Sequence, residues 1–426
     1  MIRFKNGLVM DMAGNCNPEK KEVWTDKDKI AFAGVPTDEQ LKEAVFDREI
    51  DLEGNLLMPS FKNAHTHSAM TFLRSYADDL PLQDWLFTQV FPMEAKLTGE
   101  DVYWFTKLAI LEYLSTGVTA VYDMYFKMDD YVKACIESGF RSVLCDAVSG
   151  NKERIVELEE KYEKFNNISP LIKYDLGFHA EYTAELGLME EIAKLSHRLK
   201  TRVSTHNSET VKEVRECIEK YGKTPTELFD SLGLLDYGGA FFHCVHLSDN
   251  DIDILKNRGV WAVHCPASNL KLASGVAPMV KLADRGVGLA LGTDGPASNN
   301  CLDMFREMFL MTALQKLTLS DASAFPADDV LRAACCGSAK AMGFDDCDCI
   351  APGKQADLIV IDLNKPNMRP INNIAKNIVY SGSKQNIKLT MCAGKVLFEN
   401  GSYFVGEDET RIYAKCEEHT EAIKKR

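Results

Sequence analysis

Apolar runs that end in a histidine or an acid are the feature that most limits how this chain can fold. Four such runs occur, and each reads as a buried strand. They are, in chain order, the run at 55–58 ahead of His65-Thr-His67, the run at 203–205 before His206, the run at 240–242 before His243 and the run at 287–293 before Asp294. The C-terminal ends of parallel strands form the active-site face of a (β/α) barrel. The pattern therefore predicts that these side chains meet at one such face.

The His65-x-His67 pair is the most informative of these endings. Side chains two residues apart on a strand point to the same side, roughly 6–7 Å apart along the chain, so both imidazoles can converge on one metal ion. The alternative is two polar residues on a solvated strand face. The pair follows a buried run and Pro59, and it opens a long α/β region, which favours the metal site.

The middle of the chain alternates between two patterns from Leu56 to about Ala351. Amphipathic helices are expected at 101–115, 130–138, 185–199 and 251–257, and strands at 120–124 and 141–146. Such alternation indicates a parallel sheet. Eight strand–helix units closed on themselves make a barrel, so the predicted class is α/β with a (β/α)8 TIM-like barrel.

Both ends of the chain are richer in strands. Residues 1–57 show short strands at 2–10, 30–33 and 49–52 without a helical period, and strands return at 357–362, around Val379 and at 389–398. The tail from about Glu407 is expected to be a polar helix with a frayed end at Lys424–Arg426. The chain thus divides into 1–57, a barrel at 58–352, a second strand-rich part at 353–406 and a C-terminal helix at 407–426.

Composition limits the class of protein. Apolar residues make up 46% of 426 residues, enough for one large domain and a small one. No run approaches 18 apolar residues, so no membrane span is expected. The N-terminus lacks an apolar signal-peptide core, and thirteen irregularly placed cysteines are expected to be reduced thiols in the cytoplasm. Cys347 and Cys349 have the wrong spacing for a zinc knuckle.

The charge balance bears on partners. A net charge of −14 argues against nucleic acid, because phosphate binding needs a basic face. It does not exclude a small ligand that carries no phosphate. The sequence leaves open whether the chain forms a homo-oligomer.

The motifs together resemble those of the amidohydrolase superfamily. The order is His-x-His, then His206 with Glu209 three residues on, then His243, then Thr-Asp294-Gly. Within the superfamily the chain most resembles the 5′-methylthioadenosine/S-adenosylhomocysteine deaminases. Stretches 243–247, 266–272 and 292–300 carry that likeness, which extends to 353–361. The resemblance also implies that both strand-rich ends pair as one small β-sandwich.

The expected site chemistry follows from the ligand types and from the family roles. His65, His67, His206 and Asp294 suit one divalent ion, with Zn²⁺ favoured and Fe²⁺ or Mn²⁺ as alternatives. Such an ion lowers the pKa of water toward about 7. By resemblance, Asp294 would accept the water's proton, His243 would orient the attacking hydroxide and Glu209 would protonate the purine ring.

Each catalytic assignment has a plainer alternative. Glu209 could be a solvated loop acid and His243 a structural histidine, while His246 is interpreted as structural. A second metal would need a bridging lysine or Glu near a mid-barrel strand end. Lys173 lies at the wrong end of its strand for that role, so one ion is expected.

Substrate contacts rest on the resemblance alone. Trp85 would pack on the base, Glu94 would bind the ribose hydroxyls, and His179 would contact the sugar or its 5′ side. Glu209 and Asp294 would also touch the substrate. The alternatives are a core tryptophan, a helix-surface acid and a buried structural histidine.

One position departs from the family. Some relatives hold the carboxylate of S-adenosylhomocysteine with two arginines after the third barrel strand. Here Asp146 aligns with the first, Arg154 matches the second, and Arg141 is expected to point away. An acid facing a carboxylate repels it, so neutral substrates such as 5′-methylthioadenosine or 5′-deoxyadenosine are expected to be at least as good.

The predicted function is a metal-dependent deaminase that converts such adenosines into the inosine-type product and ammonia. Two alternatives stay open at this point. One is an aminohydrolase of guanine, an oxidised purine or a triazine, against which Glu94 counts. The other is a non-catalytic metal-binding scaffold, which would need one ligand or Glu209 to be missing, and every such position is filled.

Overall fold

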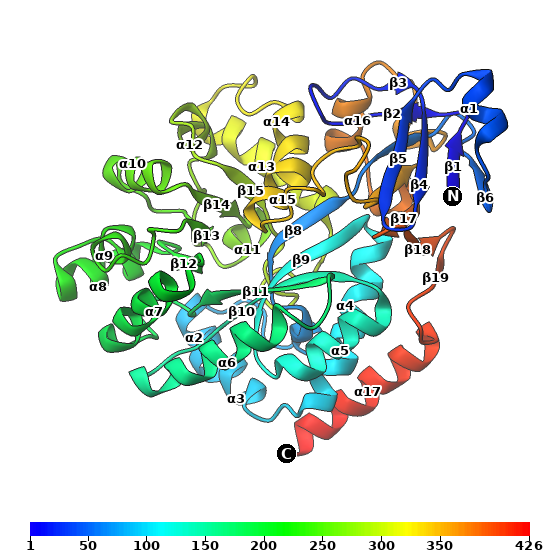
Figure 1. Ribbon diagram of the computed structural model, residues 1–426. Coiled ribbons are helices and arrows are strands. Elements are labelled where there is room, and N and C mark those ends of the chain that lie inside the picture. The colour runs from blue at the N-terminus through cyan, green and yellow to red at the C-terminus, as the bar shows by residue number, and fades with distance from the viewer.

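Eight parallel strands form the centre of the molecule in the computed structural model, which describes residues 1–426. Neighbours in the sheet are also neighbours in the sequence, as in a barrel, and helices surround them (Figure 1). The strands are β8 (Phe61–Thr66), β9 (Val118–Tyr125), β10 (Arg141–Asp146), β11 (Ile172–Gly177), β12 (Val203–Asn207), β13 (Gly239–His243), β14 (Val260–His264) and β15 (Leu289–Leu291). The predicted barrel is confirmed.

The barrel closes between its last and first strands through a short set of polar bonds. The Asn63 amide donates to the Thr293 hydroxyl at 2.7 Å and its carbonyl oxygen accepts the Thr293 N–H at 2.9 Å. The Asp294 N–H donates to the His65 carbonyl at 2.9 Å. Closure therefore places two predicted metal ligands beside each other.

The outer helices begin and end where capping residues stand. Thr98 forms a capping box with Asp101, and Ser248 forms one with Asp251, before a helix that ends at Gly259 with φ 65°. The longer helices are α4 (Gly99–Ser115), α5 (Met128–Ser138), α6 (Ile155–Phe165), α7 (Leu186–Leu199), α8 (Val211–Tyr221), α10 (Asp249–Arg258) and α13 (Met304–Leu319). Shorter ones are α9 (Pro225–Ser231), α11 (Pro266–Lys271), α12 (Met279–Asp284), α14 (Ala327–Arg332) and α15 (Ser338–Ala341).

Two further sheets come from the chain ends, as expected. A four-stranded sheet has the order β5-β4-β1-β6, and a seven-stranded sheet has the order β19-β18-β17-β16-β7-β2-β3. Their strands are β1 (Ile2–Lys5), β2 (Leu8–Val9), β3 (Glu19–Lys20), β4 (Glu22–Asp26), β5 (Lys29–Gly34), β6 (Arg48–Asp51), β7 (Leu56–Pro59), β16 (Leu358–Ile361), β17 (Ile387–Cys392), β18 (Lys395–Glu399) and β19 (Ser402–Tyr403). One cluster of buried apolar residues, including Phe4, Val23, Leu57 and Leu358, lies between the sheets.

Three local predictions were wrong. The apolar run Leu56–Met58 is a buried strand as predicted, but it is β7 of the outer sheet, and a separate strand, β8, carries His65. Residues 38–43 form helix α1 (Asp38–Glu43), which the Thr37 capping box starts although no side chain in it is buried. Val379 lies in helix α16 (Ile374–Tyr380), where Ile374 and Ile378 pack inward one turn apart.

The C-terminal helix α17 (Glu409–Lys425) is present as predicted, but its end is not frayed. It packs along α4 (Figure 1). The His419 ring contacts the buried Asp101 carboxylate at 2.6 Å, and the Arg426 guanidinium donates to the same group at 2.5 Å. The last residue is thus tied to the start of α4.

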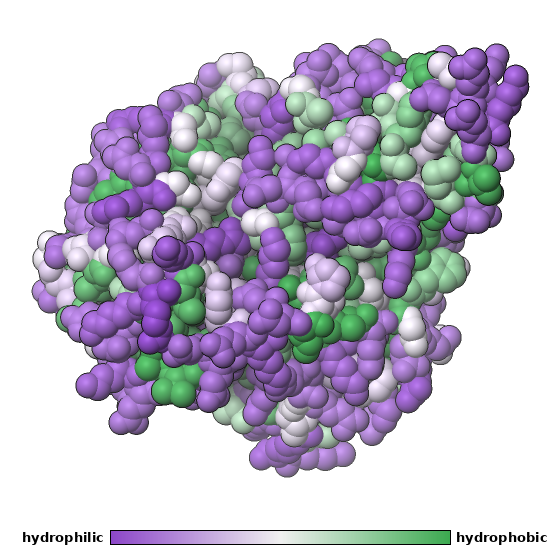
Figure 2. Space-filling model, viewed as in Figure 1, coloured by the Kyte–Doolittle hydropathy of each residue, from purple (hydrophilic) through white to green (hydrophobic).

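The surface in Figure 2 is mostly hydrophilic, with scattered apolar patches. None of the helices combines the length and the apolar character that crossing a membrane requires. All thirteen cysteines are free thiols.

Candidate active site

A cavity of about 860 Å³ lies at the C-terminal ends of the barrel strands. All six residues predicted to contact substrate line it, and so do His67, His206 and His243. The six are Trp85, Glu94, Arg154, His179, Glu209 and Asp294. The strand-end pattern therefore brings residues from across the sequence into one space of the size that small molecules occupy.

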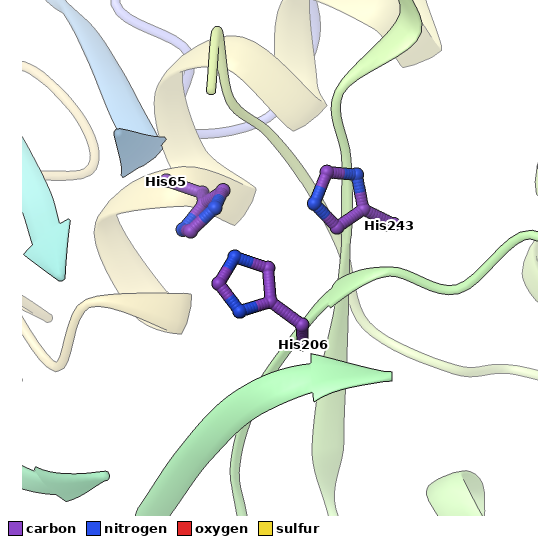
Figure 3. A group of neighbouring side chains, drawn as sticks. All are labelled: His65, His206 and His243. Atoms are coloured by element: carbon purple, nitrogen blue, oxygen red, sulfur yellow. The ribbon is translucent and has the colours of Figure 1, made fainter. Parts of the chain in front are cut away.

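The imidazoles and the carboxylate form a tight cluster at the floor of this cavity. His65 Nε2 lies 3.5 Å and His67 Nε2 3.2 Å from Asp294 Oδ1. The ligand atoms of His65, His206 and His243 lie within 4.8 Å of one another. Figure 3 shows these three rings turned toward a common space. Two overlapping groups thus share His65.

The outer nitrogen of three of the rings is held by a fixed partner. His67 Nδ1 lies 2.6 Å from the Met124 carbonyl, and His206 Nδ1 lies 2.7 Å from the His179 carbonyl. His243 Nδ1 contacts the Asn269 side-chain oxygen at 2.8 Å. A carbonyl partner at Nδ1 fixes the proton there and leaves Nε2 to face the cluster, which is how metal-binding histidines are oriented.

The chemistry of the donor set fits a cation. Burial lowers the pKa of His65 to about 3, so its ring is neutral, and neither ring nitrogen has a hydrogen-bond partner. Burial also opposes the charge on His67, but Asp294 outweighs it and raises the His67 pKa to about 9. Burial disfavours the Asp294 carboxylate, yet the two rings hold its pKa well below the usual range. The cluster thus favours one positive charge, which a metal ion supplies.

Asp294 is also fixed from the other side by two hydroxyls. Ser268 donates to its Oδ2 at 2.5 Å and Ser298 donates to the same atom at 2.7 Å. Its backbone has a left-handed φ of 59°, a conformation that costs free energy and clusters at functional sites. Sequence analysis gave the two serines no role, although Ser298 stands one turn after Asp294.

Glu209 is buried next to the His243 ring of this cluster. Its Oε2 lies 3.8 Å from His243 Nε2, and its Oε1 accepts a bond from the Ser274 hydroxyl at 3.0 Å. Burial raises the pKa of Glu209 above its usual value. A carboxyl group of this kind exchanges protons more readily near neutral pH than an exposed one does.

The residues predicted to bind base and sugar form one wall. Trp85 starts a π-helical turn at Trp85–Val90, with Phe87 and Phe91 nearby on the same wall. Burial raises the pKa of Glu94 to about 7, and its Oε1 has no partner in the protein. Burial lowers the pKa of His179 to about 3, which keeps its ring neutral.

The outer end of the cavity holds Asp146 and Arg154, each with a local partner. Asp146 Oδ2 accepts bonds from Lys161 at 2.8 Å and from the Tyr174 hydroxyl at 3.0 Å. Arg154 forms a two-pronged ion pair with Glu157 at 2.8 and 2.9 Å. The ion pair with Lys161 offsets the negative charge of Asp146, which weakens the repulsion of a carboxylate expected from the sequence. No sequence signal linked Lys161 to the site.

Two basic residues lie away from the cavity, as expected. Arg141 pairs with the buried Asp357 at 3.1 Å. The Lys173 ammonium contacts the Gly343 carbonyl and lies over the Phe344 ring. Both are at the opposite end of the barrel strands, so neither reaches the metal-binding cluster.

Comparison with known proteins agrees with this geometry. The model of the amidohydrolase family matches residues 56–397. The chain belongs to the amidohydrolase family.

Relatives of nearly equal length indicate which branch of the family this chain resembles. A 5-methylthioadenosine/S-adenosylhomocysteine deaminase of Caldanaerobacter subterraneus subsp. tengcongensis is 38% identical over 99% of this chain and 98% of its own. A 5′-deoxyadenosine deaminase of Methanopyrus kandleri is 37% identical over 95% of each chain. Among solved structures, an adenosine deaminase from Xanthomonas campestris with bound zinc has a TM-score of 0.94 at 32% identity, covering 100% of this chain and 99% of its own. The predicted class, a hydrolase of C–N bonds in cyclic amidines, is confirmed.

Proposed function

We propose that this amidohydrolase deaminates adenosine-type nucleosides whose 5′ position carries a small substituent. Water adds at the amine-bearing carbon of the purine, the C–N bond breaks, and ammonia leaves an inosine-type product. Support comes from the deaminase relatives and from a cavity that is lined by the histidine cluster, by the buried acid Glu209 and by aromatic side chains.

We assign the metal to His65, His67, His206 and Asp294. Three neutral imidazoles and one carboxylate match the preferences of Zn²⁺, and the Xanthomonas relative holds zinc. When bound, the ion would make water acidic enough to act as a nucleophile near neutral pH. Fe²⁺ and Mn²⁺ suit the same ligands. Lys173 lies at the start of β11, away from the cluster, and cannot bridge a second ion, so we expect one ion per chain.

The protein's own groups would then move the protons. Asp294, fixed by Ser268 and Ser298, is placed to take a proton from the attacking water. Glu209 reaches over the same space and would give a proton to the purine ring nitrogen. His243, whose Nδ1 is held by Asn269 at 2.8 Å, would orient the nucleophile with Nε2.

The residues on one side of the cavity suit the binding of a nucleoside. Glu94 has a carboxylate oxygen without a protein partner, and a ribose offers two adjacent hydroxyls to it. Trp85 would provide a flat apolar face for the base, and His179, which lines the same cavity, would contact the sugar. Phe87 and Phe91 add apolar surface, which suits a methylthio or methyl group at the 5′ position.

The observation that carries this proposal is the buried Glu209 lying 3.8 Å from His243 of the metal-binding cluster. The experiment is ammonia release from 5′-methylthioadenosine, 5′-deoxyadenosine, S-adenosylhomocysteine and adenosine, with guanine as a control. We expect turnover of the adenosines and none of guanine. Turnover of guanine alone would overturn the proposal.

A further inference from the structure

Two side chains, Ser274 and Glu213, form hydrogen bonds with Glu209. The mechanism above assigns no role to either. The inference drawn from them rests on the proposed role of Glu209 as the proton donor. Both contacts are made inside the protein, because Ser274 is 6% exposed and Glu213 is 2% exposed. Each acts on a different part of the glutamate.

Ser274 acts on the carboxyl group. Its hydroxyl donates to Glu209 Oε1 at 3.0 Å, while Oε2 lies toward His243 at 3.8 Å. A hydroxyl bonded to one oxygen stops rotation of the carboxyl group and favours the proton on the other oxygen. Ser274 therefore selects Oε2 as the atom that meets the substrate.

Ser274 is in turn held by His246. The His246 ring nitrogen Nε2 lies 2.7 Å from the Ser274 carbonyl, and the His246 N–H donates to the Ser208 carbonyl at 2.8 Å. The next residue, Gly275, has φ 127°, and a Cβ there would come 2.9 Å from Val245. His246 thus links the loop of Ser274 to the end of β12.

Glu213 acts on the backbone of the same segment. Its carboxylate accepts the N–H groups of Ser208 at 2.7 Å, Glu209 at 2.8 Å and Thr210 at 3.2 Å. Ser208 has a left-handed φ of 51°, which a serine adopts only when other contacts offset its cost. The acid of a capping box normally accepts a hydrogen bond from one backbone N–H, whereas Glu213 accepts hydrogen bonds from three.

We propose that Ser274 and Glu213 are positioning residues for Glu209. Ser274 sets which carboxyl oxygen faces the substrate, and Glu213 fixes the backbone turn from which the side chain projects. His246 supports Ser274. Misplacing a reacting group by about 1 Å can lower turnover about 10²-fold. Neither residue is assigned a contact with the substrate, so both should act on kcat rather than on KM.

The first test is Ser274→Ala. We expect kcat to fall about tenfold to hundredfold with KM and metal content little changed, and Ser274→Thr, which keeps the hydroxyl, to recover most of the loss. Ser196→Ala is the matched control, because Ser196 is a buried serine that donates to the Thr201 carbonyl far from the site. An equal loss of kcat in both alanine variants would overturn the proposal.

A double-mutant cycle separates positioning from general damage. In a Glu209→Gln background the proton donor is gone, so adding Ser274→Ala should cost almost nothing more. A full additional loss in that background would mean that Ser274 acts without Glu209, and would overturn its assigned role.

Glu213→Gln is compared with Glu227→Gln. Glu227 closes the capping box of α9 with Thr224 just as Glu213 closes that of α8 with Thr210, so both variants weaken a helix start. Only Glu213→Gln should lower kcat, by about tenfold or more. Equal kcat values for the two variants would overturn the assignment of Glu213.

These outcomes remain distinct from those for the proposed function. A Glu209→Gln enzyme with normal kcat would remove Glu209 from the mechanism. A strong loss in Glu209→Gln with no loss in Ser274→Ala and Glu213→Gln would keep the mechanism and refute the positioning. If Glu213→Gln does not fold, Ser274→Ala and its cycle decide the proposal.

Discussion

The two ends of the cavity are built in opposite ways. At the floor, His65 and His206 lie on the barrel strands β8 and β12, and Asp294 follows β15. Partners behind the cluster fix His206 and Asp294. At the outer end, Asp146 and Arg154 pair with Lys161 and Glu157, which lie on the neighbouring helix α6. Residues from several barrel strands therefore position the floor. Local ion pairs position the outer end, which is called the rim below. We therefore expect large effects from changes at the floor and small, substrate-dependent effects at the rim.

The largest effect is expected for His206→Ala. Removing one of four ligands should empty the site and cost several kcal/mol of transition-state stabilisation, on the order of 10³-fold in kcat/KM. Metal analysis should find about one divalent ion per wild-type chain and far less in the variant. His197→Ala, which changes an exposed histidine, should keep both metal and activity. Two ions per wild-type chain, or full occupancy in His206→Ala, would contradict the single-site assignment.

Next comes Glu209→Gln, which keeps the shape of the side chain but removes its proton. We expect kcat to fall at least about 10²-fold, the usual scale for a positioned acid–base group, with metal content unchanged. Steady-state kinetics and metal analysis on the same sample check this. A variant that loses its metal would place Glu209 among the ligands instead.

The rim should respond more weakly and only to charged substrates. Lys161→Met uncovers the charge of Asp146, so kcat/KM for S-adenosylhomocysteine should fall about tenfold while that for 5′-methylthioadenosine stays nearly constant. Asp146→Arg should act in the opposite direction. Because Lys161 neutralises Asp146, the wild-type preference for the neutral substrate should be smaller than tenfold. Equal responses of the two substrates would show that the rim does not touch the 5′ substituent.

The remaining prediction concerns the stability of the protein rather than its turnover. Burial and the nearby Glu213 raise the pKa of Glu181 to about 9. A raised carboxyl pKa means that the folded state binds the extra proton, so Glu181 carries no penalty below about pH 4.5, the unfolded value. The free energy of unfolding should fall as pH rises from there toward 9, by at most about 1.4 kcal/mol per pH unit. Chemical denaturation at several pH values should show a shallower fall for Glu181→Gln, and an identical slope would refute the shift.

The sequence predicts the floor of the cavity better than it predicts the rim. The floor was predictable because His206 and Asp294 follow apolar runs of the barrel, and parallel strands bring their C-terminal ends to one edge whatever the loops do. The apolar run before His65 belongs to the outer sheet, but the His-x-His pair still marked the end of a barrel strand. His65, His206 and Asp294 therefore met in the structure as the pattern indicated. Their catalytic and metal-binding roles stay predictions until the variants above are measured.

The rim and the supporting contacts were not predictable in this way. Lys161 reaches Asp146 from a helix fifteen residues on, and Ser274 reaches Glu209 from a loop two strands away. Such contacts depend on the conformation of loops, which the hydrophobic periodicity of the sequence does not predict. Likewise Val379 belongs to a helix because Ile374 and Ile378 find a buried surface, and tertiary packing outweighs the local strand propensity.

The seven-stranded outer sheet has a consequence for synthesis. In it β7 lies between β2 and β16, so its second neighbour comes from the far end of the chain. During translation, a nascent chain that ends before β16 leaves one edge of β7 open, and open edges recruit foreign strands. The growing polypeptide must protect this segment through the synthesis of the entire barrel, which makes stalled or truncated products the forms most prone to aggregate.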